Sequence, residues 1–102
     1  MRFKVRLDPN AHRDFNRHVD YFQSKVDLVS RVTELEDDLL GTLAFIGEQP
    51  FLRREVYPNV RHEALRVFSY HVWYRTYEGA DLIDVFAILH QTVNRSAVEA
   101  RF

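Results

Sequence analysis

The hydrophobic pattern of this chain changes its period near residue 60, and that change limits the folds that the chain can adopt. Before residue 60, apolar side chains recur at spacings of three and four, as on one face of an α-helix. From Val60 onward, β-branched and aromatic residues dominate short runs that are typical of strands. Helices followed by a run of strands predict an α+β fold, with the helices on one face of an antiparallel sheet.

The first half of the chain predicts one strand and two helices. Residues 2 to 7 alternate basic with apolar side chains, which indicates a strand with one buried face. The dipeptide Asp8-Pro9 then supplies an N-cap and a proline at the first helical position, so a helix is expected from about 9 to 25. Asp27 is expected to cap a second helix that ends near Gly47.

An acidic run within this second helix is most simply its solvated face, and a contact with a basic partner is the alternative. The run consists of Glu34, Glu36, Asp37 and Asp38.

The second half predicts three strands, at about 61–68, 71–77 and 82–90, with the turn EGAD at 78–81 joining the last two. The expected order is therefore βααβββ: an N-terminal strand, a helical hairpin, and a three-stranded antiparallel meander that completes one sheet. Ser96 and Glu99 stand at capping-box spacing and predict a short C-terminal helix. With no internal repeat or linker, residues 1–102 are expected to form a single domain.

A turn at 78–81 places Tyr77 opposite Leu82, and this register assigns every residue of the hairpin to a face. One face is apolar and is expected to receive the helices, with the pairs Thr76–Ile83, Tyr74–Val85, Val72–Ala87 and Tyr70–Leu89. The other face is expected to be exposed, with the pairs Arg75–Asp84, Trp73–Phe86, His71–Ile88 and Ser69–His90.

Side by side on an exposed face, Trp73 and Phe86 would form an apolar patch of the kind that binding surfaces use. The patch, with His71 and Arg75 beside it, is therefore the candidate partner-binding surface. Its alternatives are cover by the C-terminal tail and nucleobase stacking. Arg75 is expected to form a cross-strand ion pair with Asp84, and the alternative is an arginine free to contact a phosphate or carboxylate.

His90 ends the last predicted strand, and a histidine among arginines could act as a general base on an RNA 2′-hydroxyl. Arg61, Arg66 or Arg75 would then stabilise the charge that develops on the phosphate. The alternative is a strand-end histidine bonded to backbone.

Composition excludes several classes of function. The absence of cysteine excludes disulfides and thiolate chemistry, and suits a reducing cytoplasm. No apolar run approaches the length of a membrane span, so a cytoplasmic protein without a membrane partner is expected. The histidine spacing predicts no metal site, and the lack of a glycine-rich phosphate loop agrees with the expectation of no cofactor.

The stretches ALRVFSYHVWYR and VFAILHQTVNRSAVE, in the order βααβββ, resemble the RelE/ParE superfamily of type II toxins over nearly the whole chain. The closing sequence is more similar to ParE-like, plasmid-stabilisation members than to RelE nucleases. This resemblance implies a toxin that a cognate antitoxin, ParD-like or similar, wraps and neutralises. It also implies one of two targets: ParE-like members poison DNA gyrase, and RelE-like members cut mRNA in the ribosome.

This sequence differs from the nuclease members of the superfamily, which rely on a dense Lys/Arg cluster and a tyrosine or histidine near the C-terminus. Here lysine occurs only at positions 4 and 25, no tyrosine follows Tyr77, and the net charge is -1. A non-enzymatic inhibitor of gyrase is therefore the favoured interpretation. An mRNA endonuclease with RNA and the ribosome as partners, or an inactive member that only binds its antitoxin, are the alternatives.

Overall fold

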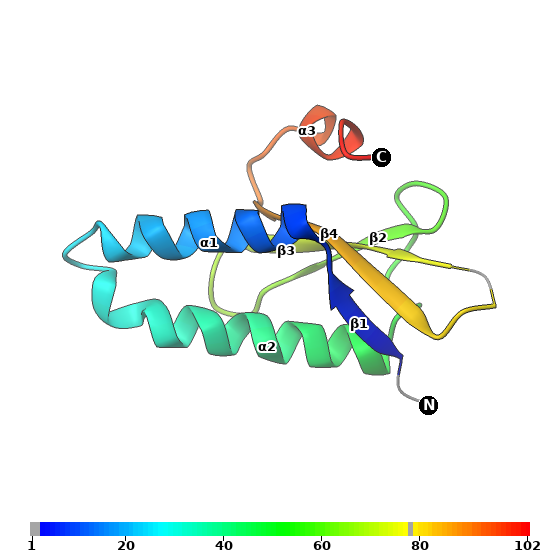
Figure 1. Cartoon of the computed structure of the whole chain (residues 1–102), viewed down its shortest axis with the longest axis horizontal. Coiled ribbons are helices and arrows are strands. Elements are labelled where there is room, and N and C mark those ends of the chain that lie inside the picture. Colours follow the sequence, from blue (N-terminus) through cyan, green and yellow to red (C-terminus); the bar gives the residue numbers. More distant parts are fainter. Residues whose placement is uncertain (1–2, 78) are drawn as a thin grey trace.

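Four strands form one sheet, and two long helices lie side by side against one of its faces (Figure 1). This computed structural model describes residues 3–77 and 79–102, so Arg2 of the predicted first strand and Glu78 of the predicted turn lie outside it. The elements are β1 (Lys4–Leu7), α1 (Pro9–Gln23), a 3-10 turn η1 (Val29–Arg31), α2 (Val32–Glu48), β2 (Val60–Ala64), β3 (Tyr70–Thr76), β4 (Leu82–His90) and α3 (Arg95–Glu99).

The sheet has the strand order β1-β4-β3-β2, in which β1 runs parallel to β4 and the other neighbours are antiparallel. The predicted α+β architecture, including the short C-terminal helix, is confirmed. Because β1 pairs with only the first half of β4, from Leu82 to Val85, no strand among residues 3–77 and 79–102 lies beside the second half of β4 on that side.

The first helix begins as predicted, and the second does not. Asp8 caps α1, since its carboxylate accepts a hydrogen bond from the Ala11 amide at 3.0 Å. Asp27 is not the cap of α2, because η1 separates them and α2 begins only at Val32. Arg31 stands at the N-cap without a capping side chain and instead bonds Glu34 in the first turn.

The main core lies between the helices and the sheet. The buried members from the helices are Ala11, Phe22, Leu35, Leu39 and Ile46. The buried members from the sheet and its connections are Leu65, Tyr70, Val72, Tyr74, Ile83, Val85 and Ile88.

A β-bulge changes the register that the sequence predicts for the last hairpin. Pairing follows the prediction from Thr76–Ile83 to Tyr74–Val85, but Trp73 then pairs with Ala87 instead of Phe86. The extra residue turns the rest of β4 over, because one added residue moves every following side chain to the opposite face. The predicted pairs Trp73–Phe86, Val72–Ala87, His71–Ile88, Tyr70–Leu89 and Ser69–His90 are therefore wrong.

The acidic run of α2 is not the wholly solvated face that the sequence predicted, because Asp38 is buried. Its buried carboxylate accepts hydrogen bonds from the backbone amides of Arg66, Val67 and Phe68 at 2.9–3.0 Å. Glu34, Glu36 and Asp37 are exposed as expected. Asp38 thus fixes the β2–β3 connection against α2, since three charge-assisted bonds converge on one carboxylate.

Side chains close the unpaired half of β4. The Asp14 carboxylate of α1 accepts a hydrogen bond from the Ile88 amide at 2.9 Å, and Arg101 donates to the Phe86 carbonyl at 3.3 Å. Arg101 also forms a two-pronged ion pair with Asp14, with Nη2 at 2.9 Å from Oδ1. His18 Nε2 lies 2.6 Å from the Ile88 carbonyl, and this nitrogen must donate because a carbonyl can only accept.

We predict that Arg101→Ala lowers the free energy of unfolding by about 3 kcal/mol, because Asp14 is only 2% exposed and would keep a buried charge without its partner. Urea denaturation measures the change. Arg17→Ala is the matched control: this arginine lies 4.0 Å from the same carboxylate but is mostly exposed, and its loss should cost less than about 0.5 kcal/mol. Equal effects of the two substitutions would contradict this account.

Candidate functional site

The second face of the sheet, opposite α1 and α2, carries a small apolar cluster that α3 covers. Its buried members are Val60, Trp73, Phe86, Ala87 and Val98. Trp73 is 6% exposed and Phe86 is 1% exposed, so the expectation of an exposed patch is wrong. Val98 of α3 is buried in the same cluster, and cover by the C-terminal tail is therefore the arrangement that the structure adopts.

Polar and aromatic contacts hold α3 over this face. Asn94 caps the helix, since its side chain accepts a hydrogen bond from the Ser96 amide at 3.0 Å. The Tyr57 hydroxyl donates to Glu99 at 2.8 Å, and this bond raises the pKa of Tyr57. The Phe102 ring lies 4.7 Å from the Tyr57 ring and 6.1 Å from the Phe86 ring. Arg101, just after the helix, also pairs with Asp14. The five-residue helix α3 and the residues after it are thus held to the chain at Tyr57, Phe86 and Asp14.

Arg75 lies over aromatic rings and not against the aspartate opposite it. Its guanidinium carbon is 4.6 Å from the centroid of the Phe86 ring and 6.0 Å from that of Phe102. Asp84 pairs with Arg6 on β1 at 3.4 Å, so the predicted ion pair between Arg75 and Asp84 is wrong although their register is right. An arginine stacked on two rings contributes to the cover of Phe86.

Two histidines stack at the border of this face. The His62 ring on β2 lies 4.8 Å from the His71 ring on β3, with 14° between the ring planes, and 4.5 Å from the Trp73 ring. Burial lowers the pKa of both histidines, and the proximity of His71 lowers the pKa of His62 further. His71, a predicted partner-binding residue, thus lies next to Trp73 but is less buried.

The residues proposed for RNA cleavage do not form one cluster. His90 pairs with Tyr70 of β3, and Arg61 pairs with Tyr74 of the same strand. These two positions are four residues apart, so His90 and Arg61 are separated by roughly 13 Å along the strand direction. Arg61 is buried and donates to the Arg53 carbonyl at 2.9 Å. His90 is exposed, and its Nδ1 accepts a hydrogen bond from the Thr92 amide at 3.2 Å, as in the backbone-bonded alternative.

The two remaining arginines of that set lie on opposite faces of the sheet. Arg75 is beside Phe86 on the second face, whereas Arg66 lines a groove beside α2. The geometry therefore does not assemble the four candidates around one phosphate.

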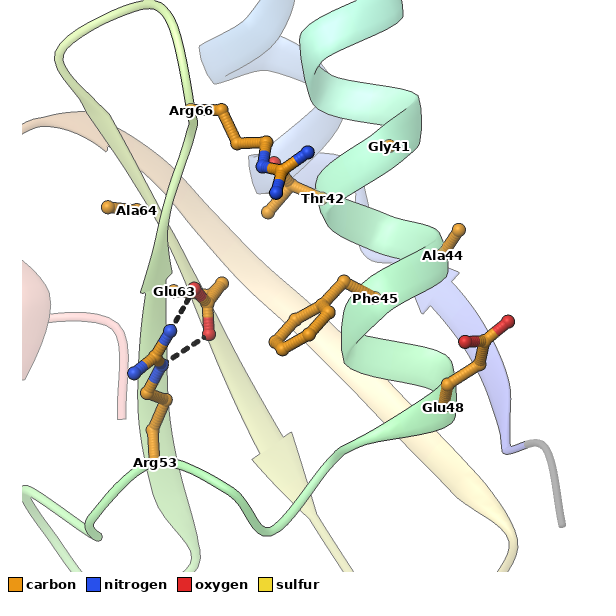
Figure 2. Close-up of a pocket in the computed structure, with 9 residues that line it drawn as sticks. All are labelled: Gly41, Thr42, Ala44, Phe45, Glu48, Arg53, Glu63, Ala64 and Arg66. Atoms are coloured by element: carbon orange, nitrogen blue, oxygen red, sulfur yellow. Dashed lines mark hydrogen bonds and ion pairs between the residues drawn. The ribbon is translucent and has the colours of Figure 1, made fainter.

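A groove that the sequence does not reveal lies between α2 and β2 (Figure 2). Its volume is about 390 Å³, within the range of ligand-binding clefts. It is lined by Gly41, Thr42, Ala44, Phe45, Glu48, Arg53, Glu63, Ala64 and Arg66. The one sequence signal that could have pointed to it is Gly41, a glycine inside a helical pattern with no turn to explain it.

Within the described residues, no three histidine or acidic side chains are grouped so that they could hold a metal ion. In the same part of the chain, no helix is both long and apolar enough to cross a membrane.

No protein-family model and no curated protein matches this sequence. Solved structures share its fold at low identity. The chromosomal ParDE toxin–antitoxin system from P. aeruginosa is 13% identical, with 86% of this chain and 95% of that chain covered and a TM-score of 0.66. The RelBE2 toxin–antitoxin complex from Mycobacterium tuberculosis is 20% identical, with 88% and 99% covered and a TM-score of 0.53. The isolated E. coli RelE toxin is 15% identical, with 96% and 94% covered and a TM-score of 0.56.

These likenesses define the class of fold, a mixed sheet with a helical hairpin on one face that toxins of toxin–antitoxin systems share. More particularly, the chain has the RelE/ParE toxin fold, as its sequence pattern indicates. Of the three structures, the ParDE system superposes with the highest TM-score.

We predict that the protein loses stability as the pH falls from about 7 to 5. Burial lowers the folded-state pKa values of His18, His62 and His71 from 6.5. Their contribution is fully present above pH 6.5 and is lost as the pH falls through the lower folded-state pKa values, because the unfolded chain then binds more protons. Thermal unfolding of His62→Gln should show a weaker pH dependence in this window, and His12→Gln, on the exposed side of α1, serves as the control. A dependence unchanged by His62→Gln would contradict this role.

Proposed function

We propose that this protein is the toxin of a type II toxin–antitoxin system and that a cognate, ParD-like antitoxin neutralises it in the cytoplasm. The observation that supports this most is the likeness to the ParDE system, which spans 86% of this chain and 95% of that one. The structures of RelBE2 and of E. coli RelE with an antitoxin peptide add toxins of the same fold that bind antitoxins. The single unit over residues 1–102 would then be one toxin domain.

Inhibition of DNA gyrase without catalysis is the mode of action that we propose. It is supported by the ParE-like closing sequence and by the separation of His90, Arg61, Arg66 and Arg75 in the fold. Two of these arginines are engaged: the buried Arg61 donates to the Arg53 carbonyl, and Arg75 lies over aromatic rings. Cleavage of mRNA in the ribosome, with His90 as base, is the alternative.

For the partner-binding surface we propose Trp73, Phe86, His71 and Arg75, as the sequence indicates, with one condition that the structure adds. Because α3 covers Trp73 and Phe86, an antitoxin can reach them only when α3 leaves the second face. The antitoxin segment would then replace one apolar cover by another. Trp73→Ala is a poor test of this surface, since truncating a buried tryptophan destabilises the fold itself by about 3–5 kcal/mol.

In a gyrase supercoiling assay, the purified protein should inhibit the reaction when in excess, and the cognate antitoxin should restore activity. The same preparation should leave mRNA intact in a translating extract. Cleavage that disappears in His90→Gln, together with unimpaired gyrase at any excess of toxin, would replace the gyrase target by the endonuclease alternative.

Tyr57→Phe should tighten antitoxin binding. The substitution removes the hydrogen bond to Glu99 but keeps the ring contact with Phe102, so α3 is released at a lower free-energy cost. The dissociation constant measured by isothermal titration calorimetry should therefore fall. Tyr21→Phe, an exposed tyrosine on α1, is the control. Unchanged or weaker binding of Tyr57→Phe would mean that α3 stays in place.

A further inference from the structure

We infer that a pocket on the second face of the sheet binds a small aromatic carboxylic acid, with the carboxylate on Arg75 and the ring against Tyr57 and Phe102. The bound acid holds α3 in place, because Phe102 follows this helix closely in the chain. This inference goes beyond the proposed function and does not depend on it, since it concerns a small ligand of the free chain.

The pocket lies between the loop before β2, strand β3 and the C-terminal end of the chain. It is lined by Tyr57, Pro58, Val60, Arg75 and Phe102, and its volume is about 440 Å³. This volume is within the range of small-molecule sites. Val60 is buried and Phe102 is 56% exposed, so one side of the pocket belongs to the apolar cluster and the other opens to solvent.

Arg75 is the charged group of this pocket, and its hydrogen-bonding capacity is unused. A guanidinium has five N–H donors. Within the described residues, those of Arg75 make no hydrogen bond, and no carboxylate lies within 4 Å of them. Asp84, the residue opposite Arg75, instead bonds Arg6 and the hydroxyl of Tyr77.

Two aromatic rings hold the guanidinium of Arg75 in position. One is the buried Phe86, 4.6 Å away, and the other is Phe102 on the wall of the pocket, 6.0 Å away. Contacts with rings leave the N–H groups of an arginine free to bond in the plane of the guanidinium. An arginine held in this way is prepared for the two parallel hydrogen bonds that a carboxylate accepts.

The other walls of the pocket suit an aromatic ring. The rings of Tyr57 and Phe102 meet edge to face, with centroids 4.7 Å apart and 78° between their planes. The Tyr57 hydroxyl already donates to Glu99, so this residue offers its ring and not a free donor. Pro58 and Val60 add apolar surface. A ring that carries a carboxylate therefore matches the pocket better than a bare anion or a neutral ring.

The ligand and the position of α3 are coupled, because Phe102 forms a wall of the pocket only while α3 covers the second face. A ligand that binds the covered state alone stabilises that state. The amides of Ala100 and Arg101 report on this state, since they bond to the carbonyls of Ser96 and Val98.

The test is isothermal titration calorimetry of the full-length chain with phenylacetate at neutral pH. Phenylacetamide keeps the ring but loses the charge, and inorganic phosphate keeps a charge but has no ring. Phenylacetate should bind saturably and at least about tenfold more tightly than either probe. No saturable binding of phenylacetate, or equal affinity for either comparison probe, would overturn the inference.

Arg75→Gln should weaken phenylacetate binding about tenfold and remove its advantage over phenylacetamide. Arg6→Gln is the matched control, because this arginine pairs with Asp84 outside the pocket, and it should leave the affinity within about twofold of wild type. Thermal unfolding of each variant without ligand verifies that the fold is kept. Arg75→Lys retains the charge without the planar fork and should bind with intermediate affinity.

Hydrogen exchange provides a second measurement that needs no variant. Saturating phenylacetate should slow exchange at the amides of Ala100 and Arg101, whereas phenylacetamide at the same concentration should not. Binding of phenylacetate without slower exchange at these amides would place the acid elsewhere on the chain and overturn the assignment of the pocket.

Discussion

The ion pair between Asp14 and Arg101 is the contact on which the arrangement of the C-terminal half depends. Asp14 is on α1, on one face of the sheet, and Arg101 follows α3, on the other. The pair therefore closes around the edge of β4 that β1 leaves unpaired, and the same two side chains bond Ile88 and Phe86 there. Breaking it would remove both a cover of this edge and one of the three contacts that hold α3 over the second face.

The sheet thus has one closed edge and one open edge, and the difference follows from where charged side chains lie. An unpaired strand edge is a site for unwanted pairing, and proteins usually block it. Here α1 and the C-terminal residues block β4. In β2, by contrast, no bond within the described residues satisfies the outward backbone groups of His62 and Ala64.

The sequence predicted the elements and the helix-facing core, except for Ala87 and Leu89 after the bulge, because both depend on local pattern. The period change near Val60, the cap at Asp8 and the alternation in β3 all act within a few residues, and each led to the correct element. The bulge at Phe86 was not predictable, since nothing in the order of apolar residues shows where one strand carries an extra residue. The ion pair of Asp14 with Arg101 and the hydrogen bonds of Asp38 join residues that are 28 to 87 positions apart. The local pattern of apolar and polar residues does not indicate which distant residues will meet.

The candidate partner surface was half predictable for the same reason. The alternation of side chains along β3 predicted that Trp73 lies on the face away from the helices. Phe86 lies on the same face despite the bulge, so the prediction of a shared face is right although the predicted pair is wrong. Their burial was decided by α3, a helix of five residues that is too short to be stable alone. A cover that forms only through its contacts with the face beneath is also one that another apolar segment can replace.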